Sequence, residues 1–119
     1  MHRRLAVRLG AAACGVLFSG IAAVFSANAQ SLPRIKQGTP YGDARKILMS
    51  QGYKPVSLPG AQKCGPGDDD RCFPEAFACA GTGTAACIYT WQRGAMVIEV
   101  RTRFESPEVS EVRCRSNCR

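Results

Sequence analysis

The sequence is poor in the residues that most catalytic and metal sites use. It contains one histidine and one tryptophan in 119 residues, and the histidine, His2, stands just before an apolar run. If the first segment is removed on export, nucleophile pairs of the Ser-His and Cys-His type are excluded. A zinc site would then have to be built without an imidazole ligand.

Long hydrophobic runs are also missing, apart from one near the start. Residues 1–8 carry three arginines, residues 9–25 are almost wholly apolar, and residues 26–29 are small residues of the kind that a signal peptidase reads. The apolar run is shorter than the ~20 residues that span a bilayer. We therefore predict a signal peptide, residues 1–29, rather than a retained anchor or a lipoprotein modified at Cys14.

The sequence has little excess charge once this segment is set aside. Its removal takes three of the 16 basic residues and none of the 9 acidic ones, which leaves a net charge of +4 on residues 30–119. Nucleic-acid binding proteins show a much denser basic stripe. We expect no nucleic acid as partner and no membrane span after cleavage, and the expected partner is an envelope protein or glycan.

Cysteine is the residue that the chain has in quantity. Removal of Cys14 leaves six cysteines, and an even number in a short exported chain predicts three disulfides in an oxidising compartment. A Cys-x-x-Cys redox motif is absent, and the acidic run Asp68–Asp70 lacks the loop pattern of a calcium site. We expect structural disulfides, no cofactor and no metal, and location in the periplasm or outside the cell. The six cysteines are Cys64, Cys72, Cys79, Cys87, Cys114 and Cys118.

Six cysteines allow fifteen pairings, and the sequence leaves more than one open. Local pairs are slightly favoured: Cys64–Cys72, Cys79–Cys87 and Cys114–Cys118. The nested alternative joins Cys64 to Cys87 around a Cys72–Cys79 bond.

One amphipathic helix is predicted between Thr39 and Gly52. Thr39 is a candidate cap, Pro40 suits the first helical position, and Gly52 suits the left-handed stop. Apolar residues recur at helical spacing through the segment. A short segment with a proline, residues 53–58, follows as an edge strand or an extended connector.

The second half of the chain alternates with the period of β-strands. Residues 86–92, 95–104 and 109–115 each place apolar residues on one side, with a tight turn at Arg93-Gly94. Val112 and Cys114 are expected to point inward, and at most one helical turn is expected around residues 74–78. The sum is an α+β fold in one domain, residues 30–119. We expect an N-terminal amphipathic helix packed on a three- or four-stranded antiparallel meander, stapled by disulfides, in a monomer.

Three resemblances follow from these segments. Leu32-Pro33 and residues 38–56 resemble the opening of a PASTA repeat, which implies peptidoglycan or β-lactam-like ligands. The order of helix and meander is similar to modules of the β-lactamase-inhibitor and SmpA/OmlA type, which act by binding proteins. The Pro-Tyr-x-x-Ala-Arg helix at Pro40–Arg45 and the Cys72–Trp91 block resemble a group of small uncharacterised exported proteins of alphaproteobacteria. No activity is assigned to that group, so this resemblance adds none.

The candidate site residues are few. Glu75 is the carboxylate most expected to be half buried, where it would cap a turn or pair with Arg71, or act as a raised-pKa acid. Trp91, with Tyr89 and Phe77, would offer a sugar platform if exposed, although a small domain favours placing these aromatics in the core. The possible binding residues are Arg71, Glu75, Trp91, Arg101 and Arg103.

These observations favour a non-catalytic binding module, protein-binding or inhibitor-like, in the periplasm. One alternative is a binder of peptidoglycan or another anionic glycan. The other is a small glycan hydrolase that uses Glu75. The sequence does not identify the ligand or partner.

Overall fold

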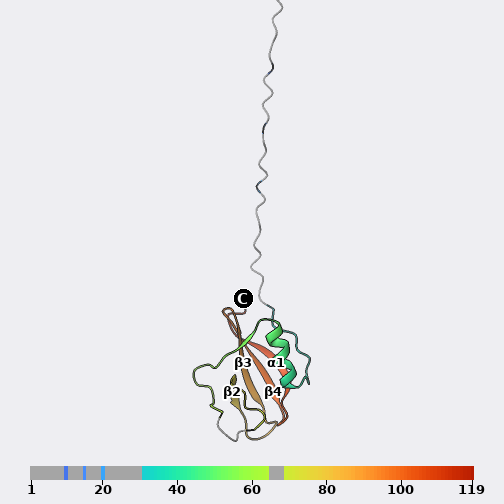
Figure 1. The fold of residues 1–119 in the computed structure, drawn as a ribbon, viewed down its shortest axis with the longest axis vertical. Coiled ribbons are helices and arrows are strands. Elements are labelled where there is room, and N and C mark those ends of the chain that lie inside the picture. Colours follow the sequence, from blue (N-terminus) through green and yellow to red (C-terminus); the bar gives the residue numbers. More distant parts are fainter. Residues whose placement is uncertain (1–9, 11–14, 16–19, 21–30, 65–68) are drawn as a thin grey trace, which may run out of the picture.

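A computed structural model describes residues 10, 15, 20, 31–64 and 69–119. The predicted signal peptide lies outside the described residues apart from three isolated glycines, and Asp68 lies outside them too. The elements follow in the order α1 (Tyr41–Ser50), β1 (Lys54–Pro55), β2 (Ala76–Cys79), β3 (Cys87–Arg93), β4 (Met96–Arg103) and β5 (Glu108–Ser116). The fold is α+β, as predicted, and α1 precedes all the strands (Figure 1).

The helix begins and ends near the predicted residues but is not capped as expected. Gly52 adopts the left-handed backbone, with φ of 83°, that ends a helix. Thr39, however, donates its hydroxyl to the carbonyl of Lys36 and not to the helix. The amide of Tyr41 instead donates to the carbonyl of Pro107 at 2.8 Å. The start of α1 is therefore tied to the chain just before β5, and the prediction of Thr39 as cap was wrong.

The strands form one antiparallel sheet of five strands. The order is β1-β3-β4-β5, and β2 pairs with the same strand, β3, as β1 does. The β3–β4 ladder pairs Tyr89 with Val100 and Trp91 with Ile98, which places these four side chains on one face. This meander has one strand more than the predicted range because residues 76–79 form β2. Residues 74–78, where at most one helical turn was expected, contain no helix, and from Ala76 onward they belong to β2.

The core lies between α1 and one face of the sheet. Tyr41, Ala44 and Leu48 of the helix are buried there together with the aligned apolar residues of β3 and β4. Val112 is partly buried against this cluster. Cys114 stands opposite the core residue Ile98 and so lies on the same face of the sheet, as expected, but it is exposed there. Its disulfide partner lies in the segment after β5, where the chain curls back at the end of the sheet.

Disulfides join the six predicted cysteines in the three local pairs. Cys79 and Cys87 lie opposite each other on β2 and β3, with their Cα atoms 4.1 Å apart. The Cys64–Cys72 bond closes the loop that precedes β2, and the Cys114–Cys118 bond closes the C-terminal turn. Each disulfide closes a short loop, so the three disulfides fix local geometry and do not join elements that are distant in the sequence.

Candidate functional site

Glu75 lies at the centre of a buried polar network. Its carboxylate accepts a hydrogen bond from the Tyr41 hydroxyl at 2.7 Å and one from Arg45 Nε at 2.6 Å. Its side chain is 0% exposed, whereas that of Arg45 is 25% exposed. The indole N–H of Trp91 completes the chain by donating to Tyr41 Oη at 3.0 Å. Glu75 is thus more deeply buried than expected, and its partner is Arg45 and not Arg71.

The electrostatics of this network fit a structural role. Burial, followed by the negative charge of Glu75, raises the pKa of Tyr41 far above its usual range. Burial lowers the pKa of Arg45, but the hydrogen bond and charge of Glu75 outweigh it and leave that pKa raised. Arg45 therefore stays protonated and the Tyr41 hydroxyl stays neutral, which keeps both as donors to the Glu75 carboxylate. A general acid needs a path to its substrate, and this carboxylate is enclosed by its own partners.

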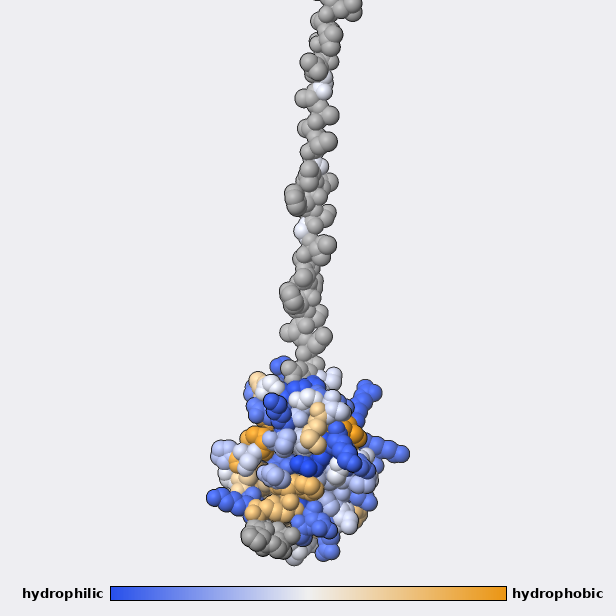
Figure 2. All heavy atoms as spheres, viewed as in Figure 1, coloured by the Kyte–Doolittle hydropathy of each residue, from blue (hydrophilic) through white to orange (hydrophobic). Residues whose placement is uncertain are grey.

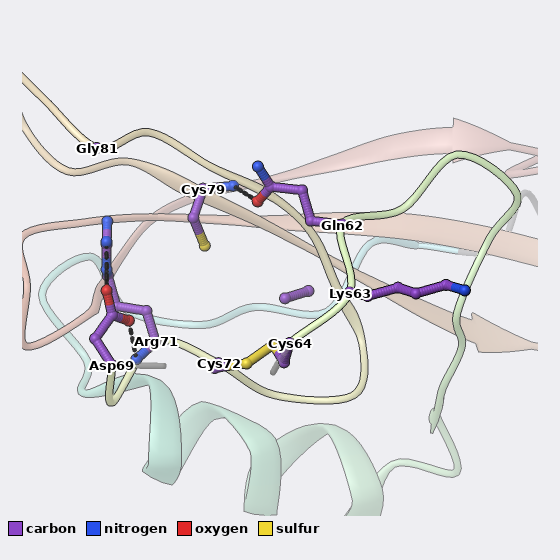
Figure 3. Close-up of a pocket in the computed structure, with 9 residues that line it drawn as sticks. Gln62, Lys63, Cys64, Asp69, Arg71, Cys72, Cys79 and Gly81 are labelled. Atoms are coloured by element: carbon purple, nitrogen blue, oxygen red, sulfur yellow. Dashed lines mark hydrogen bonds and ion pairs between the residues drawn. A yellow bond between two sulfur atoms is a disulfide. The ribbon is translucent and has the colours of Figure 1, made fainter. Parts of the chain in front are cut away.

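Arg71 is committed to the loop around it. Its guanidinium binds the carboxylate of Asp69 at 2.5 Å and donates to the carbonyl of Ala80 at 2.8 Å. The Tyr89 hydroxyl donates to the Arg71 carbonyl at 2.6 Å, which ties the same loop to the sheet. Figure 3 shows the Arg71–Asp69 pair on one side of a hollow of about 340 Å³, with the Cys64–Cys72 bond on another. Arg71 and Glu75 therefore do not form one site.

Trp91 is fully buried, at 0% exposure, so it offers no sugar platform. Tyr89 is buried beside it and stacks on Tyr41 with ring centroids 3.8 Å apart. This confirms the expectation that both aromatics belong to the core. Phe77 differs, because it is only partly buried and lies under the guanidinium of Arg115 at 4.4 Å.

The face of the sheet opposite α1 brings together charged residues from two strands. Glu99 binds Arg101 at 3.1 Å and Arg115 at 2.8 Å. Glu111 binds Arg113 at 3.0 Å and lies 3.9 Å from Arg101. Two of these pairs, Glu99–Arg101 and Glu111–Arg113, join residues two apart on one strand, which share a face, and Arg101 stands opposite Glu111. We call this surface the outer sheet face; it consists of Phe77, Glu99, Arg101, Glu111, Arg113 and Arg115.

A β-bulge brings Phe77 to this face. The register of β2 on β3 shifts between Ala76 and Ala78, so that an extra residue is inserted at Phe77. Ala76 lies in the core, while the Phe77 ring lies under Arg115, which also binds Glu99. Sequence analysis missed Phe77 and Arg115 as a pair, because a bulge has no reliable signal in an alternating pattern.

Arg103 lies on the same side of β4 as Arg101 but has a different environment. Its guanidinium lies 5.3 Å from the ring centroid of Phe104, and its Nε is buried without a hydrogen-bond partner among the described residues. A hollow of about 510 Å³ lies beside Arg101 and Glu111, next to the Cys79–Cys87 bond. Of the predicted binding residues, Arg101 therefore belongs to the outer sheet face, and Arg103 lies at its border.

Within the part of the chain that the structure describes, no three His, Cys, Asp or Glu side chains gather as ligands for a metal ion. No helix in the described ranges is long and apolar enough to cross a membrane. In the view of Figure 2, hydrophobic residues form small patches that hydrophilic residues separate.

Comparison of the chain with known proteins found no relative. No protein-family model matches the chain, and neither does any curated protein or solved structure.

Proposed function

We propose that the protein is an exported binding module without enzymatic activity, and that it recognises another protein through the outer sheet face. The observation that carries this proposal is the arrangement of that face. Two acidic and three basic side chains are held in ion pairs beside an aromatic ring, on the side of the sheet away from α1.

Such a face suits protein recognition for two physical reasons. Arginine and aromatic residues are enriched in protein interfaces, where their long or planar side chains bury large areas. Side chains already ordered by neighbours lose less conformational entropy on binding. Arg113 is 55% exposed and Glu111 42%, so both remain accessible while they are paired. Alternating charge also selects a partner with the complementary pattern.

Export is supported by the disulfides. All six cysteines of the described chain are paired in local loops. Disulfides persist in oxidising compartments and are rare in the bacterial cytosol. A small domain with short cross-linked loops gains stability that its limited core cannot supply alone. The periplasm or the outside of the cell fits this construction.

The two alternatives have less support from the geometry. A glycan binder would use an exposed aromatic as a stacking platform, but Trp91 is buried in the core. A hydrolase based on Glu75 would need that carboxylate to reach its substrate, and Tyr41 and Arg45 occupy it instead. The hydrolase remains an outcome of the experiment below.

A comparative pull-down tests the proposal. The bait is the mature protein, and the extract is that of the cell envelope. The test variant Arg113→Glu reverses the most exposed charge of the outer sheet face, and the control Lys46→Glu makes the same charge change on the exposed side of α1. We expect proteins that wild type and control retain equally and that Arg113→Glu loses. Identical retention by all three baits would contradict the proposal, as would hydrolysis of cell-wall material that Glu75→Gln abolishes.

A further inference from the structure

A second surface lies at the end of the sheet where β3 turns into β4. Lys54 of β1 stands opposite Gln92, so it lies beside the turn that contains Arg93. Arg93 is held in place, because its guanidinium lies 4.5 Å from the Tyr53 ring centroid and donates to the carbonyl of Gln51 at 3.3 Å. No carboxylate of the described residues lies within 4.0 Å of either cation.

The C-terminal segment adds a further cation, Arg119, to this end of the sheet. Asn117 donates its side-chain amide to the carbonyl of Ala95 at 3.1 Å, which fixes the segment that carries Arg119 against the β3–β4 turn. In Figure 1 the end of α1, the C-terminus and the start of the segment 31–40 lie at the same end of the domain. We call this surface the basic end; its cations are Lys54, Arg93 and Arg119.

The acidic residues gather at the opposite end. Glu108 pairs with Pro40 at the start of α1, and Asp43 lies in the first turn of that helix. Glu105 lies close enough to Arg71 to raise the pKa of that residue, after the larger effect of Asp69. Carboxylates therefore lie at this end together with cations such as Arg71, whereas no carboxylate of the described residues forms an ion pair with Lys54 or Arg93 at the basic end.

The shape of the basic end is open. Lys54 and Arg93 line a shallow hollow of about 300 Å³ together with Gly52 and Gly94. Both glycines have positive φ, and the absence of side chains there leaves the backbone tip bare. Met49, in the last turn of α1, is 48% exposed. A flat tip with free cations and an exposed apolar side chain is complementary to a surface that presents phosphates above an apolar layer.

We propose that the basic end docks on an anionic phospholipid bilayer. Lipid phosphates supply the negative charge that Lys54 and Arg93 lack within the protein, and Met49 enters the boundary with the acyl chains. A carboxylate-bearing glycan would satisfy the cations but gives no place for Met49. Since the strands run away from this end, the outer sheet face stays accessible to a partner while the basic end rests on the membrane. The inference goes beyond the proposed function and does not depend on it.

Sedimentation with lipid vesicles tests this proposal on the mature protein alone. Vesicles of phosphatidylcholine are compared with vesicles that contain phosphatidylglycerol, at low and at 0.5 M salt. The test variant is Lys54→Gln/Arg93→Gln, which removes both positive charges. The control variant Lys36→Gln/Lys63→Gln removes the same charge from exposed positions elsewhere. Thermal unfolding confirms that both variants are folded.

We expect salt-sensitive binding to the anionic vesicles only. Because each cation near an anionic surface contributes about a fivefold change in affinity, the test variant should bind about 25-fold more weakly. The control variant should lose much less affinity for the anionic vesicles. The proposal is overturned if wild type binds both vesicle types equally or neither of them, or if both variants lose binding equally. Binding to purified peptidoglycan but not to vesicles would also overturn it. None of these results depends on a protein partner.

Discussion

The replacement of Arg45 by methionine isolates the buried charge of Glu75. In the native protein, Arg45 Nε and Nη2 contact the two carboxylate oxygens at 2.6 and 3.4 Å. Methionine keeps much of the aliphatic length of arginine but supplies no donor, so the carboxylate retains only the Tyr41 hydroxyl. The carboxylate then stays buried without a counterion.

The expected cost follows from the burial of the two partners. Removal of one member of a buried ion pair costs about 3–5 kcal/mol, because the remaining charge is uncompensated. Arg45 is 25% exposed and partly solvated, so we place the loss at the lower end, at about 3 kcal/mol. That is a large share of the roughly 5–15 kcal/mol that stabilises a typical domain.

Denaturant unfolding followed by circular dichroism measures this loss, with the slope checked for two-state behaviour. Lys46→Met, at the neighbouring exposed position, is the control and should change the unfolding free energy by less than about 0.5 kcal/mol. The double variant Arg45→Met/Glu75→Gln should recover part of the loss, because a neutral amide replaces the unpaired charge. The reasoning is refuted if Arg45→Met costs no more than the control, or if the double variant is no more stable than Arg45→Met.

Three further predictions concern the core and one of the disulfides. Trp91→Phe keeps an aromatic ring but removes the donor to Tyr41, and we expect denaturant titration to show a loss of about 1–2 kcal/mol; an unchanged midpoint would contradict the network. Burial raises the pKa of all three tyrosines, so their phenolate absorbance should appear only with alkaline unfolding. Stability should fall above about pH 10, where the unfolded tyrosines ionise first, and tyrosines that titrate in the folded protein would disprove this. Cys79→Ala/Cys87→Ala opens one short loop and should cost about 2–3 kcal/mol in calorimetry, whereas an unaltered melting temperature would show the staple to be dispensable.

The sequence predicted the elements whose signals are local. The helix was found from its apolar spacing, Pro40 and Gly52, and the strands β3, β4 and β5 from alternation around Arg93-Gly94. The preferred disulfide pairing is confirmed for the same reason, because neighbours in the chain close the shortest loops.

The contacts of Glu75 could not be predicted in this way. Its partners Tyr41 and Arg45 lie 34 and 30 residues earlier in the chain, and the packing of α1 on the sheet brings them close to Glu75. Arg71 was the nearer candidate in sequence, but it binds Asp69 and two loop carbonyls. The bulge that exposes Phe77 is likewise a property of strand pairing. The signal peptide and the resemblances to known families stay predictions.

Photo-crosslinking in living cells is the direct test of recognition through the outer sheet face. A photoreactive amino acid is placed at position 113 on the outer sheet face and, in a second protein, at position 46 on the exposed side of α1. Our account predicts a discrete cross-linked protein from position 113 that is absent from position 46. A discrete product from position 46 alone, or no protein product from either position, would contradict recognition through the outer sheet face.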